Sequence, residues 1–157
     1  MAKVSSVNGV ILEVGDIICV KGDGWLADLI PGRYDHTQIY IGNGQVIEAH
    51  GVGDELGVHY GTPQEGGDVF RVTASADVKQ KAVDWTISKV GLPYNYWLFS
   101  KRINANSYYC SELNWAAYLE AGGPDIDQNE GWSWTYFNAV APTEVADDDN
   151  TYYVGTL

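Results

Sequence analysis

The hydrophobic pattern of this chain changes its period near residue 75, and that change limits the folds it can adopt. Before it, β-branched and aromatic runs bounded by Gly, Asp and Pro predict strands at residues 16–20, 36–41, 45–50, 57–60 and 68–73. After it, apolar residues recur at helical spacing and predict helices at residues 76–90 and 109–121. Strands followed by helices predict an α+β fold.

Local signals mark the ends of the two long helices. Asp77 is the expected N-cap of the first helix, and Gly91 and Pro93 follow its last turn. The run Gly122-Gly123-Pro124 ends the second helix. Cys110 therefore lies in the first turn of that second helix.

Shorter elements complete the expected fold. A short helix is predicted at residues 25–30, and Gly42-Asn43-Gly44 is expected to join two strands as a hairpin turn. One helical turn should follow Pro142, and a short strand should form at residues 152–154. The 157 residues contain no repeat, linker or low-complexity tract, so we expect a single domain over residues 1–157.

The charge of the chain excludes one class of partner. Its formal net charge of -12 at pH 7 repels the phosphate backbone of nucleic acids, so no nucleic-acid partner is expected.

No apolar run is long enough for a membrane span, and residues 1–10 lack the features of a secretion signal. We expect a cytoplasmic protein if the chain is full length, and an extracytoplasmic one if a signal has been removed.

The two cysteines do not make a disulfide scaffold, so each is interpreted separately. At a helix start, free N–H groups and the helix dipole should lower the pKa of Cys110 and favour its thiolate. The same N–H groups can hold the oxyanion that forms when a thiolate attacks a carbonyl. The alternative for Cys110 is a small buried hydrophobe. Cys19 lies in the middle of an apolar strand, and for it the buried hydrophobe is the better interpretation.

A thiol nucleophile needs a base, which must be His36, His50 or His59. His36 begins a predicted strand directly after a turn, a favourable place for a catalytic group. The alternative for His36 is a polar surface histidine or a hydrogen-bonded core histidine. Glu48 on the next strand can orient the His36 imidazole if both side chains lie on the same face of the sheet.

The hairpin loop decides whether Glu48 can reach His36. A plain two-residue Asn43-Gly44 turn places the two side chains on opposite faces, whereas a three-residue loop or a β-bulge places them on the same face. We predict the same-face arrangement, in which Gln38 and His50 also join the pair. It has the further merit of gathering four apolar residues on the other face, namely Ile39, Ile41, Ile47 and Ala49.

Four stretches of the chain resemble, in order, a known enzyme family. They are GDIICV, DHTQIYIGNGQVIEAHG, VGLPYNYWLF and YYCSELNWAAYLEAG. They are similar to the circularly permuted branch of the NlpC-type papain-like cysteine hydrolases. That branch contains the YiiX/YebB-like proteins and, more distantly, lecithin retinol acyltransferase-like enzymes. The likeness covers residues 15 to about 145, and the order of histidine before cysteine marks the permuted branch.

The resemblance implies a fold and a set of roles. The histidine of the family falls on His36, its third polar residue on Glu48 and its cysteine on Cys110. An aromatic residue of the family that lines the oxyanion or substrate side falls on Tyr94, for which the alternative is an aromatic anchor in a loop. The implied fold is a papain-like α+β core, in which the helix bearing the cysteine packs against the antiparallel sheet that carries the histidine.

The implied activity is hydrolysis of an amide, such as a cell-wall peptide, through an acyl-enzyme on Cys110. The same residues would also serve a hydrolase or acyltransferase acting on lipids or acylated small molecules. A polar, acidic-rimmed cleft would favour the peptide, and a long apolar trough would favour the lipid. A third possibility is a catalytically silent binding module, against which the intact Cys110, His36 and Glu48 argue. No metal and no cofactor is expected, and the sequence leaves the oligomeric state open.

Overall fold

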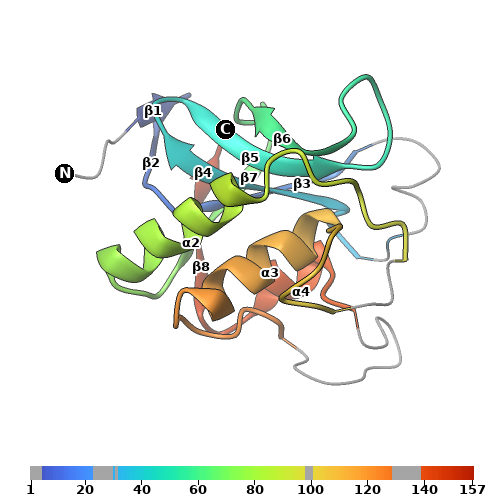
Figure 1. Ribbon diagram of the computed structural model, residues 1–157. Helices are drawn as coiled ribbons and strands as arrows, with labels where there is room; N and C mark the ends of the chain where they lie inside the picture. The colour runs from blue at the N-terminus through green and yellow to red at the C-terminus, as the bar shows by residue number, and fades with distance from the viewer. Residues whose placement is uncertain (1–4, 23–29, 31, 98–100, 129–138) are drawn as a thin grey trace.

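The computed structural model describes residues 5–22, 30, 32–97, 101–128 and 139–157 (Figure 1). All but the last residue of the helix expected at 25–30 lies outside these residues. The other expected helices and strands fall within them. Among the described residues, no helix combines the length and the apolar character that crossing a bilayer requires.

Six strands form one antiparallel sheet, which carries most of the first half of the chain. Their order across the sheet is β6 (Gly57–Gly61), β5 (Gln45–His50), β4 (His36–Gly42), β3 (Ile17–Val20), β7 (Asp68–Val72) and β8 (Thr151–Thr156). The C-terminal strand β8 is longer than predicted because it pairs along the whole of β7. A two-stranded hairpin of β1 (Ser5–Val7) and β2 (Val10–Leu12), which the sequence analysis did not predict, precedes the sheet.

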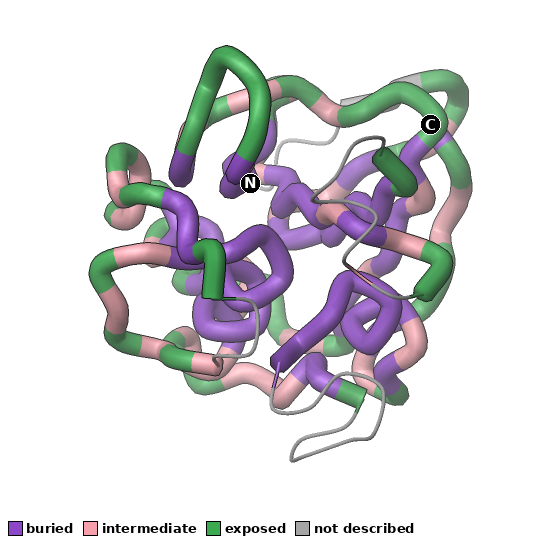
Figure 2. Tube along the Cα trace, turned by 90° about the vertical axis from the view of Figure 1, so that its right-hand side faces the viewer, coloured by how far each residue is buried: buried purple, intermediate pink, exposed green. Residues whose placement is uncertain are grey.

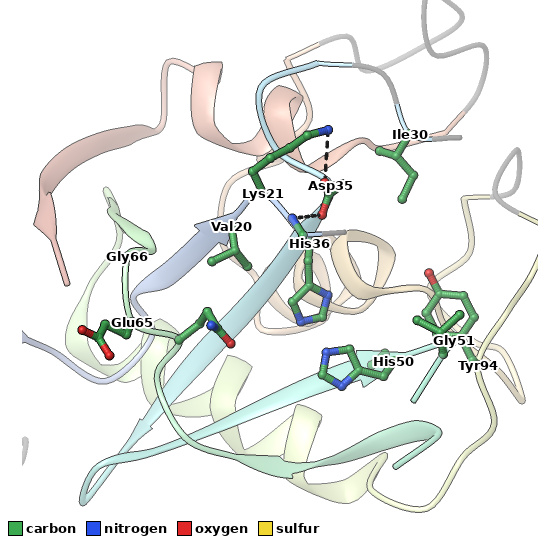
Figure 3. A pocket seen from close by; sticks show the side chains of 14 residues that line it. Val20, Lys21, Ile30, Asp35, His36, His50, Gly51, Glu65, Gly66 and Tyr94 are labelled. Carbon is green, nitrogen blue, oxygen red and sulfur yellow. Dashed lines mark hydrogen bonds and ion pairs between the residues drawn. The ribbon is translucent and has the colours of Figure 1, made fainter. Parts of the chain in front are cut away.

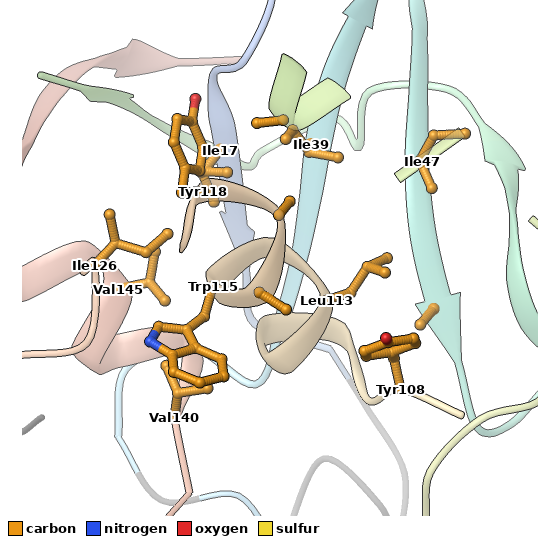
Figure 4. Packing of buried hydrophobic residues seen from close by; sticks show 14 of the residues in the cluster. Ile17, Ile39, Ile47, Tyr108, Leu113, Trp115, Tyr118, Ile126, Val140 and Val145 are labelled. Carbon is orange, nitrogen blue, oxygen red and sulfur yellow. The ribbon is translucent and has the colours of Figure 1, made fainter. Parts of the chain in front are cut away.

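The two faces of the sheet bury different sets of side chains, as alternation along a strand requires. On one face, Ile17, Ile39 and Ile47 pack against the helical residues Leu113 and Tyr118 (Figure 4). On the other face, a second cluster is formed by Leu12, Ile18, Tyr40, Val46, Val69 and Leu157. Both faces are therefore covered, and the buried parts of the chain gather in the middle of the molecule (Figure 2).

The first long helix, α2 (Ala76–Ser88), begins two residues earlier than the predicted N-cap implies. Ser75 is the observed N-cap, and its hydroxyl accepts a hydrogen bond from the Val78 N–H at 3.2 Å. Asp77 instead lies in the first turn, where its negative charge still faces the positive end of the helix dipole. The helix ends before Gly91, whose positive φ of 98° turns the chain away.

The second long helix, α3 (Cys110–Glu120), is buried along almost its whole length. The sequence predicted one buried stripe, whereas every residue from Cys110 to Tyr118 is buried. The reason is its central position: the sheet, α2 and the short helix α4 (Pro142–Asp147) all pack against it (Figure 1). The predicted α+β fold is confirmed, and α3 packs against β4 and β5 of the sheet.

Candidate active site

Cys110 is the first residue of α3, and its side chain is enclosed by the sheet. Burial alone would raise the pKa of this thiol. A hydrogen bond and the charge of His36, together with the backbone N–H groups of Thr37 and Ser111, outweigh burial, so that the pKa of Cys110 is lowered from its ordinary value. The sulfur therefore has thiolate character, as expected from its place at a helix start.

The strand β4 brings His36 to this sulfur. Burial by itself would lower the pKa of His36, but hydrogen bonds with Cys110 and Glu48 and the charges of both raise it to about 9. The His36 Nε2 atom lies 2.8 Å from Glu48 Oε1, which leaves the Nδ1 atom for the thiol. Nearby, the Asn114 amide donates a hydrogen bond of 2.7 Å to the Thr37 hydroxyl and ties α3 to β4.

The β4–β5 hairpin confirms the predicted register. Asn43 and Gly44 both have positive φ, 56° and 73°, and form a two-residue turn. A β-bulge between Tyr40 and Gly42 adds one residue to β4 and reverses the side-chain parity, so that Gln38 pairs directly with Glu48. Asn-Gly thus forms its favoured short turn, and the bulge still places Glu48 on the face of His36.

Glu48 is buried, and both of its carboxylate oxygens have hydrogen-bond partners. Its Oε2 atom accepts a hydrogen bond of 3.0 Å from the Gln38 amide, while Oε1 faces His36. Burial would raise the pKa of Glu48, but His36, His50 and Gln38 together lower it. Gln38 also donates to the Thr62 carbonyl at 3.0 Å, so one amide fixes the carboxylate against the end of β6.

The sequence analysis missed Gly61, which makes room for this carboxylate. A Cβ atom at Gly61 would collide with Glu48 Oε2. Gly61 pairs with Val46 in the sheet, and Glu48 pairs with His59, so Gly61 is the diagonal neighbour of Glu48 across the β5–β6 pair. No local sequence signal predicts the role of Gly61, because the sequence of the loop before β6 does not determine how β6 pairs with β5.

We expect Gly61→Ala to lower kcat/KM by up to about a hundredfold, because a catalytic group displaced by about 1 Å can cost that much. The φ of Gly61 lies outside the left-handed region, so alanine brings no backbone strain there. Thermal unfolding should therefore stay close to wild type while steady-state kinetics change. Unchanged kinetics would show that the carboxylate does not need this space.

A cavity of about 460 Å³ opens beside His36 (Figure 3). Asp35 and Lys21 form an ion pair of 3.2 Å at its wall, and the Lys21 side chain is 56% exposed. The lining combines polar and charged groups with apolar ones: Val20, Lys21, Gly22, Ile30, Asp35, His36, Ala49, His50, Gly51, Val52, Gln64, Glu65, Gly66 and Tyr94. It is a mixed cavity with charged groups rather than a wholly apolar one.

Tyr94 lies at this cavity, beside Gly51 in Figure 3. It is buried, and a single bridge to Tyr108 holds its backbone just ahead of α3. Burial and the negative charge of Cys110 raise its pKa, so its hydroxyl stays neutral and able to donate. Both sequence-based interpretations of Tyr94, loop anchor and lining residue, fit this position.

Cys19 has none of these features. It is buried in the middle of β3, where burial and the nearby charge of Cys110 raise the pKa of its thiol well above the ordinary value. The two cysteines are free thiols with opposite pKa shifts. Of the two, only Cys110 has the environment of a nucleophile.

Three of these side chains lie close enough together to be compared with a metal site. Within the described residues, His36, Glu48 and His50 offer ligand atoms that lie within 4.8 Å of one another. A metal ion lies in the ring plane of each histidine that binds it. The His36 and His50 rings are stacked, with centroids 4.4 Å apart and planes inclined by 17°. Because the two ring planes are nearly parallel and offset, one ion cannot lie in both of them. The arrangement fits a hydrogen-bonded cluster and does not fit a shared metal ion.

Comparisons with known proteins show which sequences this chain is similar to. Residues 11–155 match the model of a family described as permuted papain-like amidase enzymes, YaeF/YiiX, C92 family. The chain is 28% identical over 144 residues to the uncharacterized protein YycO of Bacillus subtilis (strain 168). That match covers 87% of this chain and 56% of YycO, so the chain spans about half the length of that relative.

The fold itself has a match among solved structures. The crystal structure of the metalloprotein yiiX from Escherichia coli O157:H7 superposes with a TM-score of 0.66. The match covers 92% of this chain and 97% of the other, with 21% sequence identity. At that identity the likeness concerns the fold, and it agrees with the predicted papain-like architecture.

Proposed function

The chain belongs to the family of permuted papain-like amidases, and from this premise we propose that it is a cysteine amidase with Cys110 as nucleophile and His36 as base. Glu48 orients His36 in this proposal. The observation that carries it is the mutual pKa shift of Cys110 and His36 at the start of α3, with Glu48 behind the imidazole. A lowered thiol pKa beside a raised imidazole pKa describes a thiolate–imidazolium pair.

The proposed reaction has two halves. The Cys110 thiolate attacks the amide carbonyl, and N–H groups in the first turn of α3, with the Tyr94 hydroxyl, stabilise the oxyanion. The C–N bond breaks as the His36 imidazolium gives its proton to the leaving amine. Neutral His36 then takes a proton from water, which attacks the thioester and releases the acid. The C–S bond breaks and the thiolate–imidazolium pair is restored.

The cavity supports a peptide-like amide as the substrate, of the kind found in bacterial cell walls. Asp35, Lys21 and Glu65 place charged groups in the lining of the cavity that His36 also lines, where a peptide offers charged and polar partners. The apolar side chains of the lining, Val20, Ile30, Ala49, Val52 and Tyr94, alternate with charged and polar ones, whereas a fatty acyl chain needs a continuous apolar surface. An amide substrate therefore matches the lining better than a lipid.

A thiol-labelling experiment tests the proposed pair. We expect iodoacetamide to modify Cys110 at neutral pH and to leave Cys19 unmodified in the folded protein, because only Cys110 has thiolate character. His36→Ala should slow the labelling of Cys110 by about tenfold or more. Each unit by which the pKa of the thiol rises lowers the fraction of thiolate by about tenfold when that pKa lies above the pH. Peptide mass spectrometry measures both rates.

Equal labelling of the two cysteines under native conditions would contradict the assignment. Labelling of Cys110 that does not change in His36→Ala would mean that the imidazole does not activate the sulfur. Unfolded protein, in which both thiols are exposed, provides the control for intrinsic reactivity.

The pH dependence of the reaction follows from the same shifts. Cys110 must be a thiolate, so kcat/KM should rise with pH through the lowered pKa of Cys110. His36 must be protonated to serve the leaving amine, so kcat/KM should fall as pH passes about 9. Steady-state rates across the pH range measure both limbs. A descending limb near the ordinary histidine value of about 6.5 would mean that the pKa of His36 is not raised.

A further inference from the structure

A hydrogen bond between two buried side chains joins α3 to β4 close to the reacting groups. The Asn114 amide on α3 donates to the Thr37 hydroxyl on β4 at 2.7 Å, and both side chains are buried. Asn114 lies about one helical turn after Cys110, and Thr37 follows His36 directly. The bond therefore connects the two elements that carry the proposed nucleophile and its base.

The position of α3 against β4 decides whether Cys110 can reach His36. Side chains alternate along β4, so Thr37 and Ile39 lie on the face that α3 covers, where Ile39 packs near the helix (Figure 4). His36 lies on the opposite face, where it contacts Glu48. The two reacting groups thus belong to opposite sides of the strand. A small sliding of α3 along β4 would change the distance between the sulfur and the imidazole.

Thr37 holds α3 at two points. Its hydroxyl accepts from Asn114, and its backbone N–H binds the Cys110 sulfur, where it helps to lower the pKa of the thiol. The two residues that it binds are one turn, or about 5.4 Å, apart along the helix. Two contacts at that spacing restrain both the sliding and the rotation of α3, whereas a single contact acts as a pivot.

Other hydrogen bonds of α3 lead to segments outside β4. The Ser111 hydroxyl donates to the Val140 carbonyl at 2.6 Å, and the Tyr118 hydroxyl donates to the Gly15 carbonyl at 2.5 Å. Both bonds fasten the helix to the rest of the fold. Neither reaches the strand that carries His36, so the Asn114 amide has a separate task.

Packing alone does not favour an amide at position 114. The Asn114 carbonyl oxygen is buried and has no hydrogen-bond partner among the described residues. A buried polar atom without a partner destabilises a fold, whereas the buried neighbours Leu113 and Ala117 are apolar. Departures of this kind from a stable core are expected at functional sites.

We propose that Asn114 is a positioning residue of the active site. Through the Thr37 hydroxyl it fixes the place of α3 along β4 at which the Cys110 sulfur meets the His36 imidazole. Asn114 itself does no chemistry in the proposed reaction, because it acts through Thr37. This inference rests on the proposed function, since it concerns the alignment of the proposed nucleophile and base.

A set of variants separates positioning from stability. Asn114→Leu and Thr37→Val each remove the hydrogen bond and leave its other partner buried and unpaired, so both should unfold at a lower temperature than the wild type. The double variant contains neither polar group. Its thermal unfolding should therefore return towards that of the wild type.

The kinetics should not return in the double variant. We expect kcat/KM for a peptide amide to fall by about tenfold to a hundredfold in both single variants, and by a similar factor in the double variant, because all three lack the same bond. The pH at which the rate of iodoacetamide labelling of Cys110 reaches half its maximum should rise in all three. Thr37→Ser keeps the hydroxyl and should restore most of the rate that Thr37→Val loses.

Thr86→Val is the matched control. Thr86 is a buried threonine of α2 whose hydroxyl donates to the Val83 carbonyl at 2.7 Å, away from the contact between α3 and β4. Its replacement also removes a buried hydroxyl. The kinetics and the labelling of Cys110 should stay as in the wild type, whatever the effect on unfolding.

The outcomes separate this inference from the proposed function. If the double variant regains both stability and wild-type kinetics, or if the single variants keep wild-type kinetics and labelling, Asn114 has only a structural role and the inference is wrong. The Cys110–His36 pair then stands. If wild-type Cys110 is labelled with the pH dependence of an ordinary thiol, the proposed pair fails, and this inference fails with it.

Discussion

Replacing Cys110 with serine is expected to lower kcat/KM for amide hydrolysis by about a thousandfold or more while the fold stays intact. The hydroxyl has nearly the same size as the thiol, so packing at the start of α3 is kept. A serine hydroxyl beside His36 ionises far less readily than a thiol, so the thiolate–imidazolium pair cannot form. The neighbouring Ser111 cannot replace it, because its hydroxyl donates to the Val140 carbonyl at 2.6 Å.

The assay should use a short peptide amide and, in parallel, a fatty acyl ester with the same leaving group. Loss of both activities in Cys110→Ser assigns them to one nucleophile, and the ratio of the wild-type rates reports the substrate class. Cys19→Ala is the matched control, because Cys19 is the other buried free thiol and its pKa is raised where that of Cys110 is lowered. Thermal unfolding of each variant verifies the fold. A Cys110→Ser protein with wild-type rates would contradict the proposed mechanism.

Replacing Glu48 with alanine is expected to lower kcat/KM by about a hundredfold to ten-thousandfold, the range for a residue that orients a catalytic histidine. His36 Nε2 would lose the carboxylate 2.8 Å away, and with it part of the interaction that raises the pKa of His36. Fewer molecules would then hold the thiolate–imidazolium pair at neutral pH. The descending limb of the pH profile, expected near 9 in the wild type, should move to lower pH.

Two further variants make this test specific. Glu48→Gln keeps the shape of the side chain. If the glutamine oxygen faces His36, its NH₂ group faces the NH₂ group of Gln38, and two donors then meet. We therefore expect Glu48→Gln to restore little of the activity that Glu48→Ala loses. Glu120→Ala removes an exposed acidic side chain at the far end of α3 and should leave the rates unchanged. A Glu48→Ala protein with a wild-type pH profile would show that the His36 imidazole is oriented by other groups.

Local sequence signals were sufficient where a feature depends on neighbouring residues. The change of period predicted the strands and long helices, and Gly122 with the preceding apolar pattern placed Cys110 at a helix start. Helix ends and turns follow from a few adjacent side chains, which is why they can be read from sequence. The N-cap was misplaced by two residues because Ser75 and Asp77 are both good caps, and the path of the chain after β7 selected Ser75.

The hairpin register shows where local information ends. The sequence allowed a two-residue turn, a longer loop or a bulge, and patterning favoured any arrangement with Glu48 on the face of His36. The structure combines the Asn43-Gly44 turn with a bulge at Tyr40–Gly42, which satisfies both the turn preference and the burial of Ile39 and Ile47. Burial of apolar residues on one face of the sheet decided between hairpin registers that the local sequence allowed equally well.

The sequence by itself determined the period of each segment, the helix start at Cys110 and the chemistry available at His36 and Glu48. Only the tertiary structure decided which residues surround them: Gly61 and His59 come from β6, whose register against β5 is set by strand pairing rather than by a tight turn. The cavity, likewise, joins residues from several separate segments. Spacing along the chain constrains neighbours in sequence, whereas contacts between distant segments depend on how strands pair and which faces are buried together.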